Sequence, residues 1–373
     1  MKELQDIVAG FEKVKTSGKI AAIATLVKAS GSTYRRPGAR MLMTSEGQMV
    51  GSLSGGCLEG DVFEQAQEVM TSGKPIVVQY DTMSDEDIIW GLGLGCNGIV
   101  QILIERLEEE SPLNHLAFLT ECLHRRQVGV LATVFHVEGQ VKAQVGTRLM
   151  VYPDGTLKSD IEDTDLVTQI RDDVGKALDE SRSKVKAYPL LTGKAEVFIE
   201  VIQPPVPLMI FGAGHDAIPL VRLAQELGWY VTVVDSRQAD ATRERFPSAD
   251  EVILSRPESI GDRIGLNNRT VAVVMTHNYL HDLEILKTLL PSPVRYLGIL
   301  GPKSRTEKLF QDLQEQGITP TENQLQHLYS PVGLDIGADT PEEIALSIVA
   351  EIQGVLANHS GGSLRNKLGP IHD

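Results

Sequence analysis

The sequence predicts an α/β protein in which an N-terminal mixed α/β domain is followed by a C-terminal Rossmann-like, doubly wound parallel sheet. The segment Gln203–Pro207 contains three prolines in four positions, which neither a helix nor a sheet interior accommodates. We therefore predict domains of residues 1–203 and 204–373. After the prolines, an apolar strand runs into a Gly-x-Gly turn and a helix, whereas short β-like runs, helical patterns and glycine-broken loops precede them.

The N-terminal domain is expected to alternate helices, recognised by apolar residues three and four apart, with strands, recognised by short apolar runs that end at glycine or polar turns. In chain order the expected elements are a helix at 4–14, strands at 20–27, 40–43 and 48–50, a helix from Glu59 closed at Gly73, strands at 76–80 and 99–104, a helix at 115–125, a hairpin through Glu138-Gly139, a turn at 153–155 and a helix at 163–178.

The C-terminal domain begins with the pattern expected of a dinucleotide-binding βαβ unit. A strand at 208–211 meets G-x-G-x-x-A, a helix follows to residue 227, and the next strand ends at Asp235, 21 positions beyond Gly214. Gly212 permits the tight turn, and Gly214 with His215 lets backbone approach a pyrophosphate. Asp235 is suited to accept hydrogen bonds from ribose hydroxyls. The same glycines also suit packing alone, so NAD(P) or a pterin dinucleotide is a candidate ligand rather than a consequence of the fold.

Polar residues follow the expected strand at 270–275. Ligands of doubly wound sheets bind at the carboxyl ends of the strands, which places His277 where proton transfer or phosphate contact would occur. A metal site with His281 and a helix N-cap at Thr276 or Asn278 are the alternatives. Further along, Thr340-Pro341-Glu342-Glu343 predicts a helix start with a capping box.

Cys57 lies in the most unusual segment, Gly51-Ser52-Leu53-Ser54-Gly55-Gly56-Cys57-Leu58-Glu59-Gly60, directly before a predicted helix. Unpaired backbone N–H groups at a helix N-terminus favour an anion, either the thiolate or a bound phosphate. Gly55 and Gly56 would let a ligand approach. The alternative is a tight turn with a cysteine that packs as a small apolar residue.

A second glycine-rich loop, Trp90–Gly98, carries Cys96, and four of its last eight residues are glycine. Such a loop allows close approach to a ligand at an entropic cost, so the two cysteine loops are interpreted as two sides of one site. Cys122 stands in a helical pattern and is expected to pack. Arg35 and Arg36 follow a Gly-Ser-Thr turn and suit bidentate phosphate contact, although a solvated loop with ordinary salt bridges explains them equally well.

Composition limits the classes of function. The 373 residues carry a net charge of −15 without a basic tract, which disfavours nucleic acid as a partner. No apolar run reaches about 18 residues and the N-terminus lacks a signal-peptide pattern, so we expect a cytoplasmic protein that does not enter membranes. Three scattered cysteines form neither a disulfide framework nor a zinc ribbon.

Several of these motifs together resemble those of the XdhC/CoxI family of molybdenum hydroxylase maturation factors, over almost the full length of the chain. The matching segments are Ser30–Met41, the Cys57 loop, Trp90–Gly98, Phe211–Pro219, Thr276-His277, Asp282, Gly298–Gly301 and Ile336–Ala345. The chain departs from the family pattern at Asn97 and at Pro302, and the proline removes a donor from a candidate phosphate loop.

The resemblance implies a non-catalytic chaperone that binds molybdenum cofactor (molybdopterin or its dinucleotide form), supports its sulfuration, and inserts it into apo-xanthine dehydrogenase or a related molybdenum hydroxylase. It also implies a cysteine desulfurase as a partner and a homodimer. Cys57 would then be a molybdenum ligand, because thiolate is the softest ligand that a protein offers, and Cys96 a secondary contact.

Two other interpretations of the sequence stay open. In the first, the chain is an NAD(P)-dependent oxidoreductase that binds its dinucleotide at Gly212, Gly214 and Asp235 and moves a proton through His277. In the second, the Rossmann half serves only as a docking or dimerisation surface. The chain is too short, and too poor in cysteine, to be an iron–sulfur molybdenum hydroxylase itself.

Overall fold

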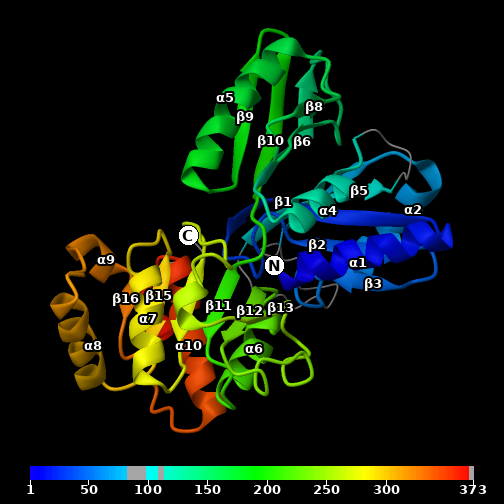
Figure 1. The fold of residues 1–373 in the computed structure, drawn as a ribbon. Helices are drawn as coiled ribbons and strands as arrows, with labels where there is room; N and C mark the ends of the chain where they lie inside the picture. The colour runs from blue at the N-terminus through cyan, green and yellow to red at the C-terminus, as the bar shows by residue number, and fades with distance from the viewer. Residues whose placement is uncertain (82–97, 108–112, 369–373) are drawn as a thin grey trace. The chain divides into compact units, whose positions relative to one another are not determined.

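The computed structural model describes residues 1–81, 98–107 and 113–368 (Figure 1). The chain divides into two compact units, one built chiefly from Glu3–Pro204 and the other chiefly from Pro205–Asn366. None of the helices formed by the described residues is both long and apolar enough to cross a membrane. The predicted fold class is confirmed, since antiparallel sheets with helices form the first unit and a parallel sheet forms the second.

The N-terminal unit contains two antiparallel sheets, a division that the sequence did not indicate. The first has the strand order β3-β2-β1-β5-β4. Its strands are β1 (Ala21–Gly31), β2 (Arg40–Thr44), β3 (Met49–Gly51), β4 (Ile76–Asp81) and β5 (Gly98–Arg106). Helix α2 (Glu59–Ser72) covers one face, whereas α1 (Lys2–Ser17) and α4 (His115–Arg125) pack on the other.

The alternation along β1 explains these two layers. Ala22 and Ala24 pack in the cluster that includes α2, and Ala21 and Ile23 pack in the cluster that includes α1 and α4. Successive side chains of a strand point to opposite faces, so a strand buried on both faces reads as a continuous apolar run. This is the pattern of the predicted strand at 20–27.

The second sheet of this unit has the strand order β8-β7-β6-β10-β9 and is covered by α5 (Thr164–Glu180). Its strands are β6 (Gly129–Gly139), β7 (Arg148–Val151), β8 (Leu157–Ser159), β9 (Lys184–Leu190) and β10 (Gly193–Ile202). The predicted turn at 153–155 joins β7 to β8.

The predicted hairpin is observed as the antiparallel pairing of β6 with β7, but its turn does not lie at Glu138-Gly139. Both residues belong to β6, which continues to Gly139 and pairs there with Gly193 at the start of β10. The chain turns towards β7 only after this point, and the backbone N–H of Gly146 donates to the carbonyl of Val134. Gly139 does adopt the left-handed backbone that favours glycine, with φ of +82°, but it lies at the end of the pairing with β10, a strand more than 50 residues away, and the turn towards β7 follows it.

The C-terminal unit is a six-stranded parallel sheet with the order β13-β12-β11-β14-β15-β16 and helices on both faces (Figure 1). Its strands are β11 (Pro207–Phe211), β12 (Tyr230–Asp235), β13 (Glu251–Leu254), β14 (Val271–Val274), β15 (Tyr296–Ile299) and β16 (Leu328–Tyr329). Its helices are α6 (Ala217–Glu226), α7 (Tyr279–Leu289), α8 (Lys303–Glu315), α9 (Glu322–Gln326) and α10 (Pro341–Leu356).

The two buried faces of the parallel sheet again follow from the alternation of side chains along each strand. Leu208 and Ile210 of β11 pack in the cluster that contains α6 and α10, whereas Met209 and Phe211 pack with α7 and α8. The predicted capping box at Thr340 is confirmed and starts α10, whose buried face includes Ile348. The direction of strand order reverses between β11 and β14, and such a switch point is where doubly wound sheets bind ligands.

Candidate functional site

The thiol of Cys57 is exposed to solvent, on a loop that leads directly into α2. Leu58 is the N-cap of this helix and provides no side-chain cap, and the predicted helix end at Gly73 is confirmed by its left-handed C-cap. The alternative of a packed turn cysteine is therefore wrong for Cys57, because the side chain is not buried.

The carboxylate of Glu59 occupies the position where an anion was expected at this helix N-terminus. Seven donors from the preceding loop converge on its two oxygens at 2.5–3.2 Å. They are the backbone N–H groups of Leu53, Ser54, Gly55, Gly56 and Leu58 and the hydroxyls of Ser52 and Ser54. Burial acts to raise the pKa of Glu59, but these hydrogen bonds outweigh it and lower the pKa to about 2. The chain itself thus supplies the anion.

Two other sequence motifs lie beside this loop. The ring of Tyr34 lies against Gly55, where an added Cβ would come within 2.9 Å of ring atom Cε1. Gly98, the last residue of the second glycine-rich loop, pairs with Gly31 at the end of β1, and an added Cβ there would overlap Thr33. The segment that starts at Ser30 therefore contacts both the Cys57 loop and the start of β5. Cys96 itself lies outside the described residues.

The two predicted phosphate-binding arginines differ in their surroundings. Arg35 makes a bidentate pair with Glu3 of α1, with nitrogen–oxygen distances of 2.7 and 2.8 Å. Arg36 is exposed. The ordinary salt bridge that the sequence left open is therefore observed at Arg35, and a phosphate there would have to compete with a carboxylate that is already paired.

Cys122 is buried among apolar side chains of α1, α4 and β6, as predicted for a packing residue. Burial raises the pKa of its thiol to about 12, which removes it from the candidate ligands. Among the described residues no group of three or more His, Cys, Asp or Glu side chains is arranged to hold a metal ion, which leaves the alternative of a His277–His281 site without a third ligand.

A buried group of charges joins the two sheets of the N-terminal unit, and no sequence motif indicated it. Arg40 of β2 forms a bidentate pair with Glu200 of β10, and Arg148 of β7 pairs with Glu105 of β5. Arg148 also donates to Nδ1 of His115, so the imidazole is held neutral with its proton on Nε2. Burial lowers the pKa of His115 well below its ordinary value, reinforced by the positive charges of both arginines.

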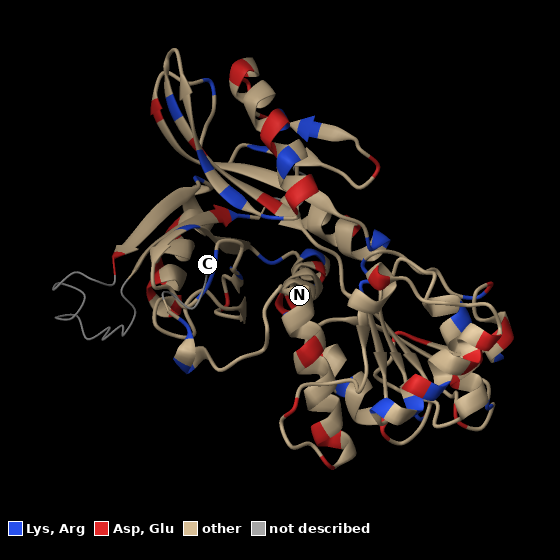
Figure 2. Cartoon of the chain, turned by 90° about the vertical axis from the view of Figure 1, so that its left-hand side faces the viewer, with Lys and Arg blue, Asp and Glu red and all other residues tan. Residues whose placement is uncertain are grey.

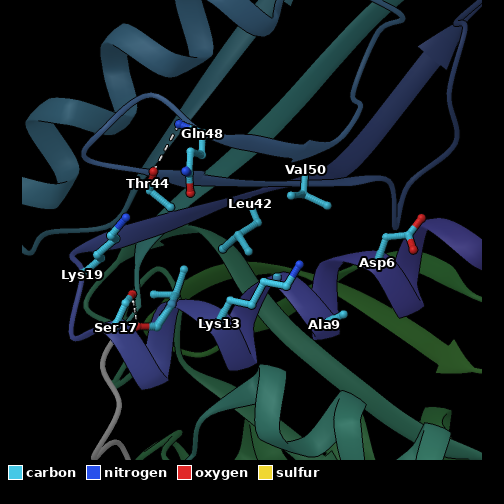
Figure 3. A pocket seen from close by; sticks show the side chains of 11 residues that line it. Asp6, Ala9, Lys13, Ser17, Lys19, Leu42, Thr44, Gln48 and Val50 are labelled. Atoms are coloured by element: carbon cyan, nitrogen blue, oxygen red, sulfur yellow. Dashed lines mark hydrogen bonds between the residues drawn. The ribbon is translucent and has the colours of Figure 1, made fainter.

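A groove of about 510 Å³ runs between α1 and strands β2 and β3 (Figure 3). Leu42 and Val50 line it from the strands, and Lys13 and Ser17 line it from the helix (Figure 3). None of the residues predicted to bind cofactor lies in it. In the view of Figure 2, Lys and Arg are interspersed with Asp and Glu over the described part of the chain.

In the C-terminal unit the predicted residues gather at the carboxyl ends of β11, β12 and β14. Gly212 has φ of +123°, and an added Cβ would overlap the carbonyl oxygen of Met275. Asp235 accepts the backbone N–H of Ala213 and a bidentate contact from Arg237, at 2.7–3.0 Å. Burial acts to raise the pKa of Asp235, but these donors lower it. The positive φ of Gly212 and the lack of space for a Cβ mean that the tight turn after β11 requires glycine at this position, as predicted.

His277 follows β14 with φ of +58°, and its Nε2 lies 2.7 Å from the Asp216 carboxylate at the start of α6. Asp216 also fills the space beside Gly214, where an added Cβ would overlap its Oδ1. His215 is exposed next to this pair. Asn278 is the N-cap of α7, which confirms that alternative for the segment. The sequence missed Asp216, although its place in the turn after β11 was a usable signal.

Both units of the chain match known protein families. Residues 208–352 match the XdhC Rossmann domain, and residues 15–81 and 122–189 match the XdhC and CoxI family. A probable xanthine dehydrogenase subunit of Bacillus subtilis (strain 168) is 35% identical over 334 residues, which cover 89% of this chain and 92% of that protein. The molybdenum cofactor insertion chaperone PaoD of Escherichia coli (strain K12) is 26% identical over 341 residues, 91% of this chain and 84% of PaoD.

A solved structure agrees with these matches. The crystal structure of a xanthine dehydrogenase from Bacillus halodurans aligns with a TM-score of 0.77 and 32% identity, covering 96% of this chain and 98% of that one. The similarity thus extends through both units, in sequence and in fold. This chain belongs to the XdhC and CoxI family.

Proposed function

We propose that the chain is a maturation chaperone that binds molybdenum cofactor, supports its sulfuration and inserts it into xanthine dehydrogenase or a related molybdenum hydroxylase. The names of two relatives, a cofactor insertion chaperone and a xanthine dehydrogenase subunit, support this proposal. The observation that carries it in this chain is the exposed thiol of Cys57, which follows Gly55-Gly56 and precedes the start of α2. A cysteine desulfurase and a second copy of the chain are the further partners that we propose.

The residues of the Cys57 loop fit one part of this cofactor and not another. When bound, the cofactor supplies a molybdenum centre, and the Cys57 sulfur is a soft ligand for such a metal. The loop N–H groups do not fit its phosphate, because Glu59 already accepts five of them. We therefore assign the phosphate end to other donors, with Arg36 the exposed candidate in the neighbouring segment.

Loss of molybdenum is the expected result of replacing Cys57. The wild-type chain, purified from a host that makes molybdenum cofactor, is expected to retain molybdenum and pterin, detected by metal analysis and mass spectrometry. The variant Cys57→Ala should retain at least about tenfold less, because alanine offers no sulfur to the metal. Cys122→Ala, at a buried thiol away from the loop, serves as the control and should retain the wild-type amount. Equal retention by both variants would contradict the role of Cys57.

A dinucleotide fits the C-terminal unit poorly. A ribose hydroxyl could bond Asp235 only after displacing Arg237, and the Asp216 carboxylate lies beside the glycine that would face the pyrophosphate. We expect titration with NADH or NADPH to leave nucleotide fluorescence unchanged up to about 100 μM protein, corresponding to binding weaker than about −5.5 kcal/mol. Saturable binding at micromolar concentration would instead support the oxidoreductase interpretation.

A further inference from the structure

Tyr34 is the aromatic side chain that the described part of the chain leaves open to solvent. It is 62% exposed, whereas every other described phenylalanine, tyrosine and tryptophan is buried or half-buried. A single exposed aliphatic side chain is ordinary on a protein surface, but an aromatic ring brings a large, flat contact area that suits a ligand. The ring next to the Cys57 loop is therefore a candidate ligand contact.

The segment that carries this ring is fixed on both sides of it. Thr33 packs against the start of β5, where a Cβ added at Gly98 would come within 2.7 Å of its Cγ2. The Thr33 hydroxyl donates to the carbonyl of Arg35 at 3.0 Å, and Arg35 itself is paired with Glu3. Because the residues before and after Tyr34 are both anchored, ordering the ring costs a ligand little conformational entropy.

Gly55 brings the ring next to the exposed cysteine. A Cβ added at Gly55 would lie 2.9 Å from Cε1 and 3.2 Å from Cζ of Tyr34, so only glycine lets the ring approach this closely. Gly55 precedes Cys57 by two residues, and two residues span at most roughly 7 Å. At Gly56 an added Cβ would meet no described atom within 4 Å. The loop thus leaves open space between the residue that contacts the ring and the cysteine.

We infer that Tyr34 binds the pterin of the cofactor by stacking, beside the sulfur of Cys57. A flat heteroaromatic ring gains contact area and electrostatic attraction when it stacks on a tyrosine ring. In molybdenum cofactor the pterin carries the sulfurs that hold the metal, so the ring nearest a metal ligand is the pterin. The inference rests on the proposed function in taking this cofactor as the ligand.

The test uses 6-hydroxymethylpterin, a fluorescent free pterin without metal or phosphate, and follows the quenching of its fluorescence by the full chain. The wild-type chain should bind it saturably, with a Kd below about 300 μM. Tyr34→Ala should weaken binding about tenfold, because it removes the stacked ring. Tyr34→Phe keeps the ring and should bind within about twofold of wild type, whereas Tyr34→Leu, apolar but not aromatic, should resemble Tyr34→Ala.

Ile20→Ala is the matched control. Ile20 is 46% exposed and lies just before β1, at the opposite end of this strand from the segment that carries Tyr34. It should bind the pterin as wild type does, and circular dichroism should show that all variants are folded. Absence of saturable quenching by the wild-type chain would overturn the inference, as would equal affinity in wild type and Tyr34→Ala. Equal affinity combined with failure to activate the target hydroxylase would assign the ring to the partner protein instead.

Failure of this inference and failure of the proposed function give different results. Cys57→Ala should bind the free pterin within about twofold of wild type, because this probe carries no metal. Molybdenum retained by wild type and lost in Cys57→Ala, combined with equal pterin affinity in wild type and Tyr34→Ala, supports the function and contradicts the stacking role. Weaker pterin binding in Tyr34→Ala, combined with no molybdenum in the wild-type chain, supports the stacking role and contradicts the chaperone function.

Discussion

Replacing Gly212 with alanine is expected to destabilise the C-terminal unit by about 3 kcal/mol or more. Its φ of +123° lies where side chains are strained, and an added Cβ would overlap the carbonyl oxygen of Met275 and lie 3.0 Å from the Cα of Thr276. Both neighbours belong to the backbone and cannot rotate away. Because β11 is paired on both sides, the strain would be transmitted to β14 as well.

The measurement is urea unfolding followed by the fluorescence of the buried Trp229, with Trp90 replaced by phenylalanine. Gly265→Ala is the matched control, since that glycine is exposed, has open space around its Cα and lies in the same unit. It should change stability by less than about 0.5 kcal/mol, or stabilise slightly through the unfolded state. Identical midpoints for the two variants would show that the turn after β11 tolerates a side chain.

Replacing Glu200 with alanine is expected to cost the N-terminal unit about 3–5 kcal/mol. The change leaves the Arg40 guanidinium, 3% exposed, without the carboxylate that satisfies two of its nitrogens. An uncompensated buried charge is far more costly than the loss of the pair as a whole. The double variant Arg40→Met with Glu200→Met should therefore recover most of the loss, because two apolar side chains of similar length replace both charges.

Thermal and urea unfolding by far-ultraviolet circular dichroism would measure these differences. Glu46→Ala provides the comparison at the surface, where the Lys19–Glu46 pair has exposed side chains and should contribute less than about 1 kcal/mol. If Glu200→Ala lowers the free energy of unfolding as little as Glu46→Ala does, the buried Arg40–Glu200 pair does not stabilise the contact between the two sheets.

Much of the fold could be predicted because its signals are local. Continuous apolar runs marked β1 and β11, Gly73 marked the end of α2, and Thr340 marked the start of α10. The turn at Gly212 and the strand ending at Asp235 were equally clear. The turn of the β6–β7 hairpin was predicted too early, because pairing with the distant strand β10 extends β6 to Gly139.

The candidate site was only partly predictable for the same reason. The sequence identified Cys57 as a cysteine at a helix start, but it predicted that the loop N–H groups were available to a thiolate or a phosphate. Glu59 stood in the motif as an ordinary first-turn acid, and nothing in its spacing showed that seven donors would fold back onto it. Arg35 was likewise identified as a candidate cation, and only the structure paired it with Glu3 of α1.

The sequence by itself determined the family, the Rossmann unit and the positions of the glycine turns, because periodicity and backbone freedom act over a few residues. Only the tertiary structure decided which charges meet: Arg40 with Glu200, Arg148 with Glu105, and His277 with Asp216, pairs separated by 160, 43 and 61 positions. Side-chain pairing across such separations depends on strand order and register, and neither is encoded in the spacing of any single motif.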